Sequence, residues 1–324
     1  MASQSSLHTF DRAERSDSIS NFMNPHVSVI IPTYNLSRIL VERSVASILV
    51  QTYSDLECVV VDDGSTDDTE QGVKAVIAHD KRVRYIKKVN GGQAAARNAG
   101  IREARGEFIA FHDHDDEFLP EYIEKALEVF GKFPDVSYLS SWAINKHADG
   151  TEKIYKPELE PFWKLAIGNG WVFRKEVFNR HDLSFDESMS GFEDLDLHIQ
   201  CHQAGLSGHI IPKPLRRYYV NLPRLVGGGS YSSSNYGRQA DHLKAFIQKN
   251  EAIYAKEGSG AVSWLYAYHA SLCLKADRMR DARTASLFAL RAAFSVSALQ
   301  ALILSFFGFA TYRWLYDTKH RLRS

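Results

Sequence analysis

The sequence predicts an α/β fold: a mostly parallel sheet with helices on both faces, followed by a helical C-terminal region. Three observations support this prediction. Short apolar runs alternate with segments whose apolar residues recur every three or four positions. The first run, Val27–Ile31, is apolar without alternation, which is typical of a strand buried on both faces. The chain has 324 residues, of which 44% are hydrophobic and 24% are charged. The length suggests about two domains, and the composition is typical of globular proteins.

The elements that follow the first strand keep this alternation. Leu36–Gln51 has helical spacing, and the strands and helices after it imply right-handed crossovers between parallel strands. In chain order we expect strand Glu57–Val61, helix Asp68–Ala78, strand Val83–Lys87, helix Ala94–Ala104 and strand Glu107–Phe111.

The next hundred residues are expected to be less regular. A helix ends at Pro134, and a hairpin turns around Ala148–Gly150. Because Pro212 and Pro214 interrupt the last apolar run, we expect two short strands there rather than one. The expected elements are strands near Val136–Ala143 and Glu152–Tyr155, an apolar piece at Gly170–Phe173, a helix over 192–204, and strands Gly208–Ile211 and Leu215–Val220.

Changes in composition predict four segments along the chain. Residues 1–24 are polar and lack the apolar run of a signal peptide, so we expect a disordered tail. The α/β domain is expected over 25–222, a Gly/Ser-rich loop over 223–237, and helices over 238–324. The three cysteines are far apart and form no CxxC pair, which fits a reducing cytoplasm.

The formal charge is balanced, with 39 Lys and Arg against 39 Asp and Glu. Binding to a nucleic acid backbone requires clustered cations, so no nucleic acid partner is expected.

Polar residues collect directly after four of the expected strands. The carboxyl ends of parallel strands share one edge of the sheet, where ligands bind. A plain alternative is that strand ends simply need polar turn residues. The segments are Pro32–Asn35, Asp62–Ser65, Asn90–Gln93 and His112–Asp116.

The fourth of these segments is unusually acidic. Gly106–Glu121 contains six acidic residues and no Lys or Arg. Crowded carboxylates repel one another unless a cation lies among them. Asp113-x-Asp115 therefore suggests a site for Mg²⁺ or Mn²⁺ with a diphosphate. A solvated acidic turn is the alternative, and zinc is disfavoured because no further His or Cys stands at suitable spacing.

Taken together, the four strand-end segments resemble the family 2 glycosyltransferases over about residues 26–220. The resemblance rests on VSVIIPTYN (27–35), VVVDDGSTDDT (59–69), GGQAAARNAGI (91–101) and FIAFHDHDDEF (108–118). It implies the A-type glycosyltransferase fold and an inverting transfer of sugar from a nucleotide-diphosphate donor to an acceptor hydroxyl, with Mn²⁺ or Mg²⁺. The QxxRW signature of processive synthases is absent, so transfer of a single sugar is expected.

The resemblance also implies roles for individual residues. Asp113 would contact the ribose, Asp115 with Asp116 would bind the metal, and Arg97 would lie near the base or diphosphate. The residues that would hold the nucleoside are Pro32, Thr33, Tyr34, Asp62 and Asp63, with one of the two aspartates on the base.

An acidic segment at the start of the 192–204 helix resembles the family's ED motif. It implies that Asp194 is the general base and that Glu193 positions the acceptor or an incoming sugar. Taken alone, acids in a first helical turn mostly offset the helix dipole. Trp171 would either stack on a sugar or lie buried in the core.

The sequence departs from the family pattern after the last expected strand. The family often has a His there, whereas this chain has Arg216 and Arg217 and then a Gly-rich loop. The last metal ligand is therefore open, and the two arginines are the candidates for neutralising the diphosphate.

Ala292–Tyr312 is a run of 21 uncharged residues, long enough to span a bilayer. Residues 274–324 around it hold nine Lys and Arg against three Asp, which favours an anionic membrane surface. Three alternatives stay open: a helix of the core or of a homo-oligomer, a helix lying in the plane of the cytoplasmic face of a membrane, and a membrane span. A lipid-linked saccharide acceptor would suit the last two.

Two other function classes compete with sugar transfer in glycan or polysaccharide assembly. One is a phosphohydrolase that uses Asp113 and Asp115 as nucleophile and acid, and the other is a non-catalytic nucleotide-binding module at a membrane surface. A dinucleotide dehydrogenase is disfavoured because no GxGxxG follows the first strand.

Overall fold

A computed structural model describes residues 26–161, 169–189, 191–220 and 235–306. Its first half is a parallel sheet of four strands in the order β3-β2-β1-β4. These strands are β1 (Val27–Thr33), β2 (Leu56–Asp62), β3 (Val83–Lys87) and β4 (Phe108–Phe111). Each coincides with an expected strand to within two residues.

The sheet continues beyond β4 with strands of mixed direction. The full order is β3-β2-β1-β4-β8-β6-β9-β5, with β7 paired to β6. Four of the eight pairings among the described residues are parallel. The predicted α/β class, with helices on both faces and helices following, is confirmed, although antiparallel strands complete the sheet. The added strands are β5 (Glu117–Phe118), β6 (Val136–His147), β7 (Glu152–Tyr155), β8 (Val172–Arg174) and β9 (Ser207–Val220).

The prediction of two short strands around the prolines was wrong. Residues Ser207–Val220 form the single strand β9, parallel to β6. The pairing shifts register here, because Ile211 faces Ser141 whereas Pro214 faces Trp142. A bulge of this kind leaves Pro212 outside the ladder, where its missing N–H costs no hydrogen bond.

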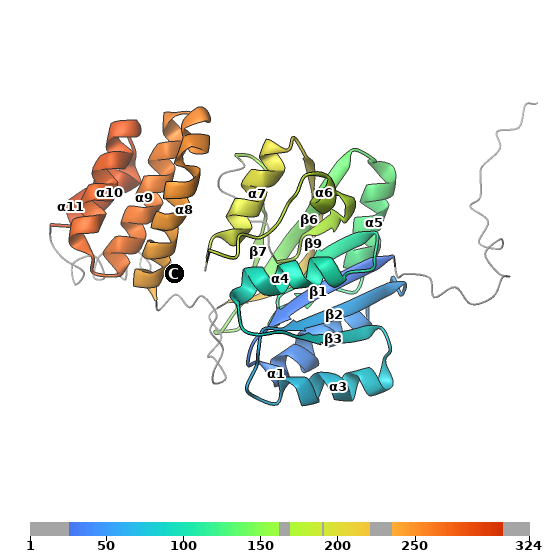
Figure 1. Ribbon diagram of the computed structural model, residues 1–324. Coiled ribbons are helices and arrows are strands. Elements are labelled where there is room, and N and C mark those ends of the chain that lie inside the picture. Colours follow the sequence, from blue (N-terminus) through green and yellow to red (C-terminus); the bar gives the residue numbers. More distant parts are fainter. Residues whose placement is uncertain (1–25, 162–168, 190, 221–234, 307–324) are drawn as a thin grey trace, which may run out of the picture.

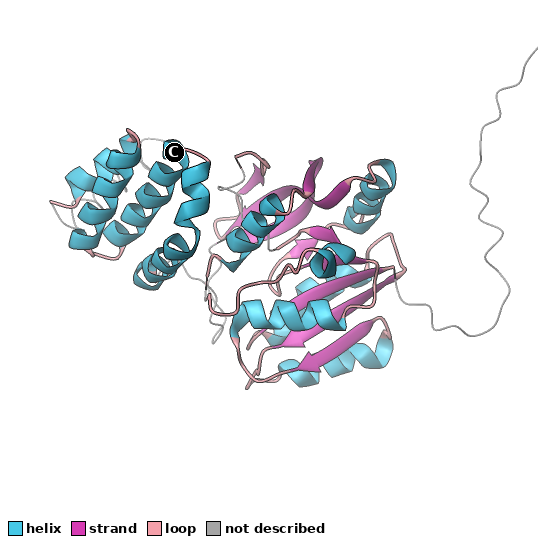
Figure 2. Ribbon diagram, turned by 45° about the horizontal axis from the view of Figure 1, so that its top comes forward, coloured by secondary structure: helices cyan, strands magenta, loops and turns pink. Residues whose placement is uncertain are grey.

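Helices cover both faces of the sheet (Figures 1 and 2). Alternate strand residues point to opposite faces, so Val29 and Ile31 enter one apolar core while Ile30 enters the other. The first face is covered by five helical elements: α1 (Ser37–Ile39), a π-helix (Leu40–Val45), α2 (Ala46–Leu49), α3 (Thr69–His79) and α5 (Tyr122–Lys132). The second face is covered by α4 (Gly92–Glu103), α6 (Glu176–Arg180) and α7 (Glu193–Gln203).

The C-terminal region is a group of helices beside α7 (Figure 1). Leu197 and Cys201 of α7 face the sheet, whereas Leu195 and Ile199 belong to the core of this helical group. The helix α7 therefore lies between the two layers, which places its N-terminus at their junction. The helices are α8 (Tyr236–Lys256), α9 (Ser259–Lys275), α10 (Met279–Ala292) and α11 (Val296–Leu304).

The uncharged run that begins at Ala292 is divided between two helices, because α10 ends at Ala292 and Ser295 caps α11. Among the described residues, no helix is both long enough and apolar enough to cross a membrane. The expected tail 1–24, almost all of the expected loop 223–237 and the rest of the uncharged run lie outside the described residues.

Candidate active site

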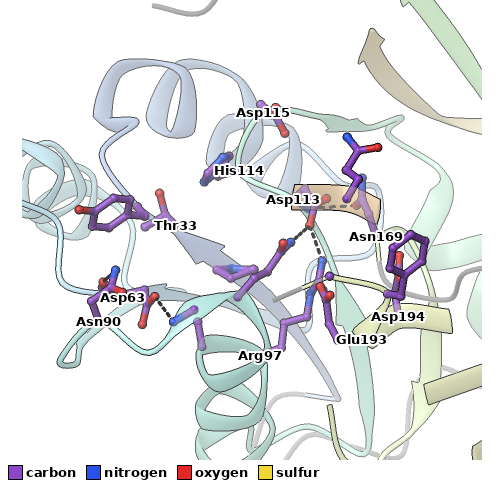
Figure 3. Close-up of a pocket in the computed structure, with 18 of the residues that line it drawn as sticks. Thr33, Asp63, Asn90, Arg97, Asp113, His114, Asp115, Asn169, Glu193 and Asp194 are labelled. Atoms are coloured by element: carbon purple, nitrogen blue, oxygen red, sulfur yellow. Dashed lines mark hydrogen bonds and ion pairs between the residues drawn. The ribbon is translucent and has the colours of Figure 1, made fainter. Parts of the chain in front are cut away.

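A cavity of about 690 Å³ opens at the carboxyl edge of the parallel strands (Figure 3). Loops after β1, β2 and β4 form one part of its wall, and the N-termini of α4 and α7 form another. The parallel register sets Thr33 opposite Asp62, so the strand-end segments converge as expected from the sequence. Of the predicted site residues, the lining contains Pro32, Thr33, Tyr34, Asp63, Arg97, Asp113, Asp115, Glu193 and Asp194.

The two adjacent aspartates after β2 point in different directions. Asp62 is fully buried, and its carboxylate accepts hydrogen bonds from the Ser65 amide (2.7 Å) and from the Tyr85 hydroxyl. It holds its own loop and does not line the cavity. Asp63 does line the cavity, paired with Lys88 (2.7 Å).

Backbone amides from the start of α4 fix the orientation of Asp63. The amides of Gly91 and Gly92 donate to its carboxylate over 2.9 and 2.7 Å. Gly92 has φ +90°, a left-handed conformation that favours glycine. Nearby, the buried Thr33 hydroxyl has no hydrogen-bond partner among the described residues.

Arg97 links the middle of the cavity to the end formed by α7. Its guanidinium is 3% exposed and lies 3.0 Å from both Asp113 and Glu193 (Figure 3). Two carboxylates on one buried guanidinium neutralise a charge that would otherwise be costly to bury. Arg97 therefore ties the loop after β4 to the first turn of α7.

The acidic loop after β4 divides its residues between the cavity and the interior. Asp115 lines the cavity, and burial together with the charge of Asp113 raises its pKa. Asp116 does not line it; its carboxylate accepts hydrogen bonds from the Tyr219 amide (3.0 Å) and the Asn169 side chain. Burial and the charge of Asp115 raise its pKa well above the usual range. Both oxygens of Asp116 thus connect the loop to neighbouring segments.

Glu193 and Asp194 form the opposite end of the cavity. Burial, followed by the charge of Asp194, raises the pKa of Glu193 to about 7, and burial raises the pKa of Asp194. Phe192, just before them, has φ +66°, which is uncommon for a bulky residue and marks local strain. Asp194, two residues after Phe192, lines the cavity.

Three residues proposed from the sequence for the acceptor or the diphosphate are not in the cavity lining. Trp171 is 2% exposed and packs among Tyr138 and His198, so it is a core residue. Arg216 is also 2% exposed, and its guanidinium donates to the carbonyls of Asn169 and Ser141. Arg217 pairs with Glu117 (2.8 Å). These contacts leave none of the three facing a ligand in the cavity.

Comparison with known proteins agrees with the arrangement of the strand-end motifs. Residues 28–186 match Glycosyl transferase family 2. The glycosyltransferase EpsJ of Bacillus subtilis, itself uncharacterized, is 33% identical over 252 residues, which cover 73% of this chain and 72% of EpsJ. The chain is a family 2 glycosyltransferase.

Other relatives share only part of their length with this glycosyltransferase. An uncharacterized glycosyltransferase of Rickettsia felis is 47% identical over 130 residues, 40% of this chain and 21% of that protein. Chondroitin synthase of Escherichia coli is 30% identical over 216 residues, 62% of this chain and 30% of the synthase. For these two relatives the chain spans less than a third of their length.

Solved structures share the glycosyltransferase fold. S. aureus TarS 1–349, in complex with UDP-GlcNAc, has a TM-score of 0.61 at 18% identity, covering 90% of this chain and 92% of that one. The mannosyltransferase PcManGT of Pyrobaculum calidifontis, in complex with GDP-Man and Mn²⁺, has a TM-score of 0.55 at 21% identity, covering 86% and 79%. At these identities the likeness concerns the fold alone.

Three residues that line the glycosyltransferase cavity belong to none of the sequence motifs. Packing between segments far apart in the sequence brings them to the cavity. Asn169 stands before β8, Gln239 on α8 and Tyr268 on α9. No strand-end pattern marks them, because two come from helices that pack against α7. Exposure cannot be read from the sequence, so no local pattern distinguished Tyr268, which is 37% exposed in the structure.

The raised pKa of Glu193 makes the stability of the glycosyltransferase depend on pH. Between 4.5, the ordinary value, and about 7, the folded state keeps a proton that the unfolded state has released. The free energy of unfolding therefore decreases as pH rises through this interval. Glu193→Gln removes this contribution, so the variant should gain stability relative to wild type as pH rises. Urea denaturation in EDTA at about pH 5 and about pH 7 measures the free energy of unfolding of both proteins. The same change in that free energy between the two pH values in wild type and in Glu193→Gln would contradict the prediction.

Proposed function

We propose that this glycosyltransferase moves one sugar, with inversion, from a nucleotide-diphosphate-sugar to a saccharide hydroxyl in glycan or polysaccharide assembly, using Mn²⁺ or Mg²⁺. The observation that carries the proposal is the order of residues along the cavity. Thr33, Asp63 and Asn90 lie at one end, Glu193 and Asp194 lie at the other, and Asp113 with Arg97 lies between them (Figure 3). A nucleotide on the first group would direct its sugar toward Asp194.

The charges of the cavity support a divalent cation. Among the described residues, the lining contains five carboxylates and one guanidinium, that of Arg97, which already pairs with two of them. A diphosphate entering this field needs added positive charge. No group of three or more metal-ligating side chains occurs among the described residues. Mg²⁺ and Mn²⁺ need only one or two protein carboxylates, because waters and substrate phosphates complete their coordination.

Asp115 and Asp113, which line the cavity, would hold the ion; Asp116 does not line it, and each of its oxygens already accepts a hydrogen bond. The ion, when bound, offsets the charge that develops on the departing diphosphate. PcManGT was solved with Mn²⁺, which supports the same class of ion here.

Asp194 would act as the general base. Its carboxylate takes the proton of the acceptor hydroxyl while the hydroxyl oxygen forms a bond to the anomeric carbon and the bond to the diphosphate breaks. A single displacement from the opposite face inverts that carbon. The raised pKa of Asp194 brings it closer to the operating pH, where a base is more effective.

In this proposal residues 25–222 form the catalytic domain, and Gln239 and Tyr268 of the C-terminal helices complete the cavity wall. Family membership leaves the phosphohydrolase alternative without support.

The test of the proposed function is release of nucleoside diphosphate from a panel of UDP-, GDP-, dTDP- and CDP-sugars with mixed saccharide acceptors. We expect release from one donor type, dependent on Mn²⁺ or Mg²⁺. No release with any donor would leave the non-catalytic alternative.

We also propose that α10 and α11 contact an anionic membrane surface on the cytoplasmic side. Several large apolar side chains here are exposed, with Phe294 at 77% and Phe306 at 66%. Arg280, Arg283 and Arg291 lie on the same two-helix segment. Apolar side chains beside cations favour anionic lipid. A lipid-linked saccharide acceptor would suit this position.

Vesicle sedimentation tests this contact. We expect co-sedimentation with phosphatidylglycerol vesicles, little with phosphatidylcholine vesicles, and a loss of several fold in Phe294→Glu. Phe133→Glu, a substitution of an exposed Phe on α5's C-terminal side, should retain binding. Unchanged binding by Phe294→Glu would contradict the contact, and mass that rises with concentration would point to a homo-oligomer instead.

A further inference from the structure

An aromatic surface leads out of the cavity beside Asp194. Tyr268 of α9 lines the cavity and is 37% exposed. Trp264 lies one turn earlier, with ring centroids 5.7 Å apart and planes inclined at 31°. Phe192 meets Tyr268 edge-on, at 6.1 Å and 81°. The three rings contact one another in a row from the start of α7 along α9, with Phe192 and Trp264 partly buried, and we call this row the aromatic platform.

Tyr266, which lies between Trp264 and Tyr268 on α9, makes different contacts. The Tyr266 hydroxyl donates to Glu251 over 2.9 Å, and its ring stacks on Phe288 at 5.2 Å. Tyr266 therefore joins helices to one another, whereas Tyr268 presents its ring to the cavity. An aromatic ring at the mouth of a polar cavity offers a flat apolar surface with a negative π face. The C–H groups on one face of a pyranose ring complement such a surface.

The charges around Tyr268 restrict which pyranose fits. Asp194 forms no ion pair with a Lys or Arg among the described residues, because the Arg97 guanidinium pairs with Asp113 and Glu193. Burial and the charge of Asp194 both raise the pKa of Tyr268, so its hydroxyl stays protonated at neutral pH. An anionic sugar here would face an unpaired carboxylate, whereas a neutral sugar would not.

We propose that the aromatic platform of Phe192, Tyr268 and Trp264 is the acceptor subsite, and that it binds a neutral pyranoside stacked on Tyr268 with a hydroxyl directed to Asp194. Tyr268 is a positioning residue in this proposal, because it orients the acceptor and takes no proton. The proposal rests on the proposed function and extends it to the chemical class of the acceptor. It also assigns a role in acceptor choice to the C-terminal helices, which provide two of the three rings.

Saturation-transfer NMR tests the platform with defined probes: methyl β-D-glucopyranoside, methyl β-D-galactopyranoside, methyl α-D-mannopyranoside, methyl N-acetyl-β-D-glucosaminide and methyl β-D-glucuronide. Spectra are recorded with and without Mn²⁺ and each nucleoside diphosphate. We expect at least one neutral probe to receive saturation on its ring C–H protons. The glucuronide should receive several-fold less than the glucoside.

The variants separate stacking from folding. Tyr268→Ala should lower the signal at least fivefold and Tyr268→Phe should retain it. Tyr268→Leu keeps apolar volume without a π face and should also lose it. Tyr266→Ala is the matched control on the same helix and should bind as wild type does. Equal signals in wild type and Tyr268→Leu, equal signals from glucoside and glucuronide, or no signal from any neutral probe would each overturn the proposal.

Nucleotide binding in the same samples identifies which proposal fails. If nucleotides bind with Mn²⁺ but no neutral pyranoside does, the platform is not an acceptor subsite and the donor site stands. If no nucleotide binds, the proposed function itself fails.

Discussion

Asp194→Asn is expected to reduce the turnover of sugar transfer by about 10²- to 10⁴-fold, the usual contribution of a positioned general base. The amide keeps the shape of the side chain and can still accept a hydrogen bond from the Leu195 amide, as Asp194 does at 2.8 Å. It cannot take up the proton of the acceptor hydroxyl. Nucleotide binding should be unchanged, because Asp194 lies at the far end of the cavity from Asp63 (Figure 3).

The neighbouring acids provide controls for this result. Asp196 is in the same helical turn but is 1% exposed and binds Lys249 (2.9 Å) and Asn250 (3.2 Å), so Asp196→Asn should affect stability more than turnover. Glu193→Gln weakens the link to Arg97 and should give a smaller loss than Asp194→Asn. Turnover near the wild-type value in Asp194→Asn would show that another group accepts the proton.

Asp115→Asn is expected to abolish the dependence of nucleotide binding on Mn²⁺. The substitution removes one of the two carboxylates, with Asp113, that face the cavity from the loop after β4 and would hold the ion. Weak binding of the nucleotide that does not depend on metal should remain, through Asp63 and the backbone amides at the same end of the cavity. Calorimetric titration of the nucleotide, with Mn²⁺ and with EDTA, measures the difference.

Asp116→Asn is the matched control for this experiment. Its carboxylate bonds to Tyr219 and Asn169, so the substitution should lower thermal stability and keep the response to Mn²⁺. Loss of the Mn²⁺ response in Asp116→Asn, with retention in Asp115→Asn, would place the ion on Asp116 instead.

The strands of the sheet were predictable because their local pattern matches their environment. A continuous apolar run such as Val27–Ile31 suits a strand covered on both faces, and its bounds differ from those of β1 only at the C-terminal end. Strand β9 was not predictable as a single strand, because Pro212 and Pro214 are accommodated there only through a bulge against β6. Local patterns do not show what a partner strand accommodates.

The same distinction applies to the cavity. The convergence of the loops with Thr33, Asp63 and Asp113 follows from parallel topology, which the alternating pattern predicts. The roles of individual residues within these loops remain predictions, as does the metal site. That Asp63 rather than Asp62 faces the cavity depends on the contacts of Tyr85 and Lys88. Tyr268 enters the site only because α7 packs between the sheet and the C-terminal helices.

The measurement that tests the central claim most directly is the binding of UDP, GDP, dTDP and CDP to the wild-type protein, each with Mn²⁺ and with EDTA. The claim is that the carboxyl edge of the parallel strands binds a nucleoside diphosphate through a divalent ion. It predicts that one nucleotide binds at least tenfold more tightly with Mn²⁺, about 1.4 kcal/mol, and that Asp115→Asn removes this gain. Equal binding of all four nucleotides with and without metal, or no binding at all, would contradict it.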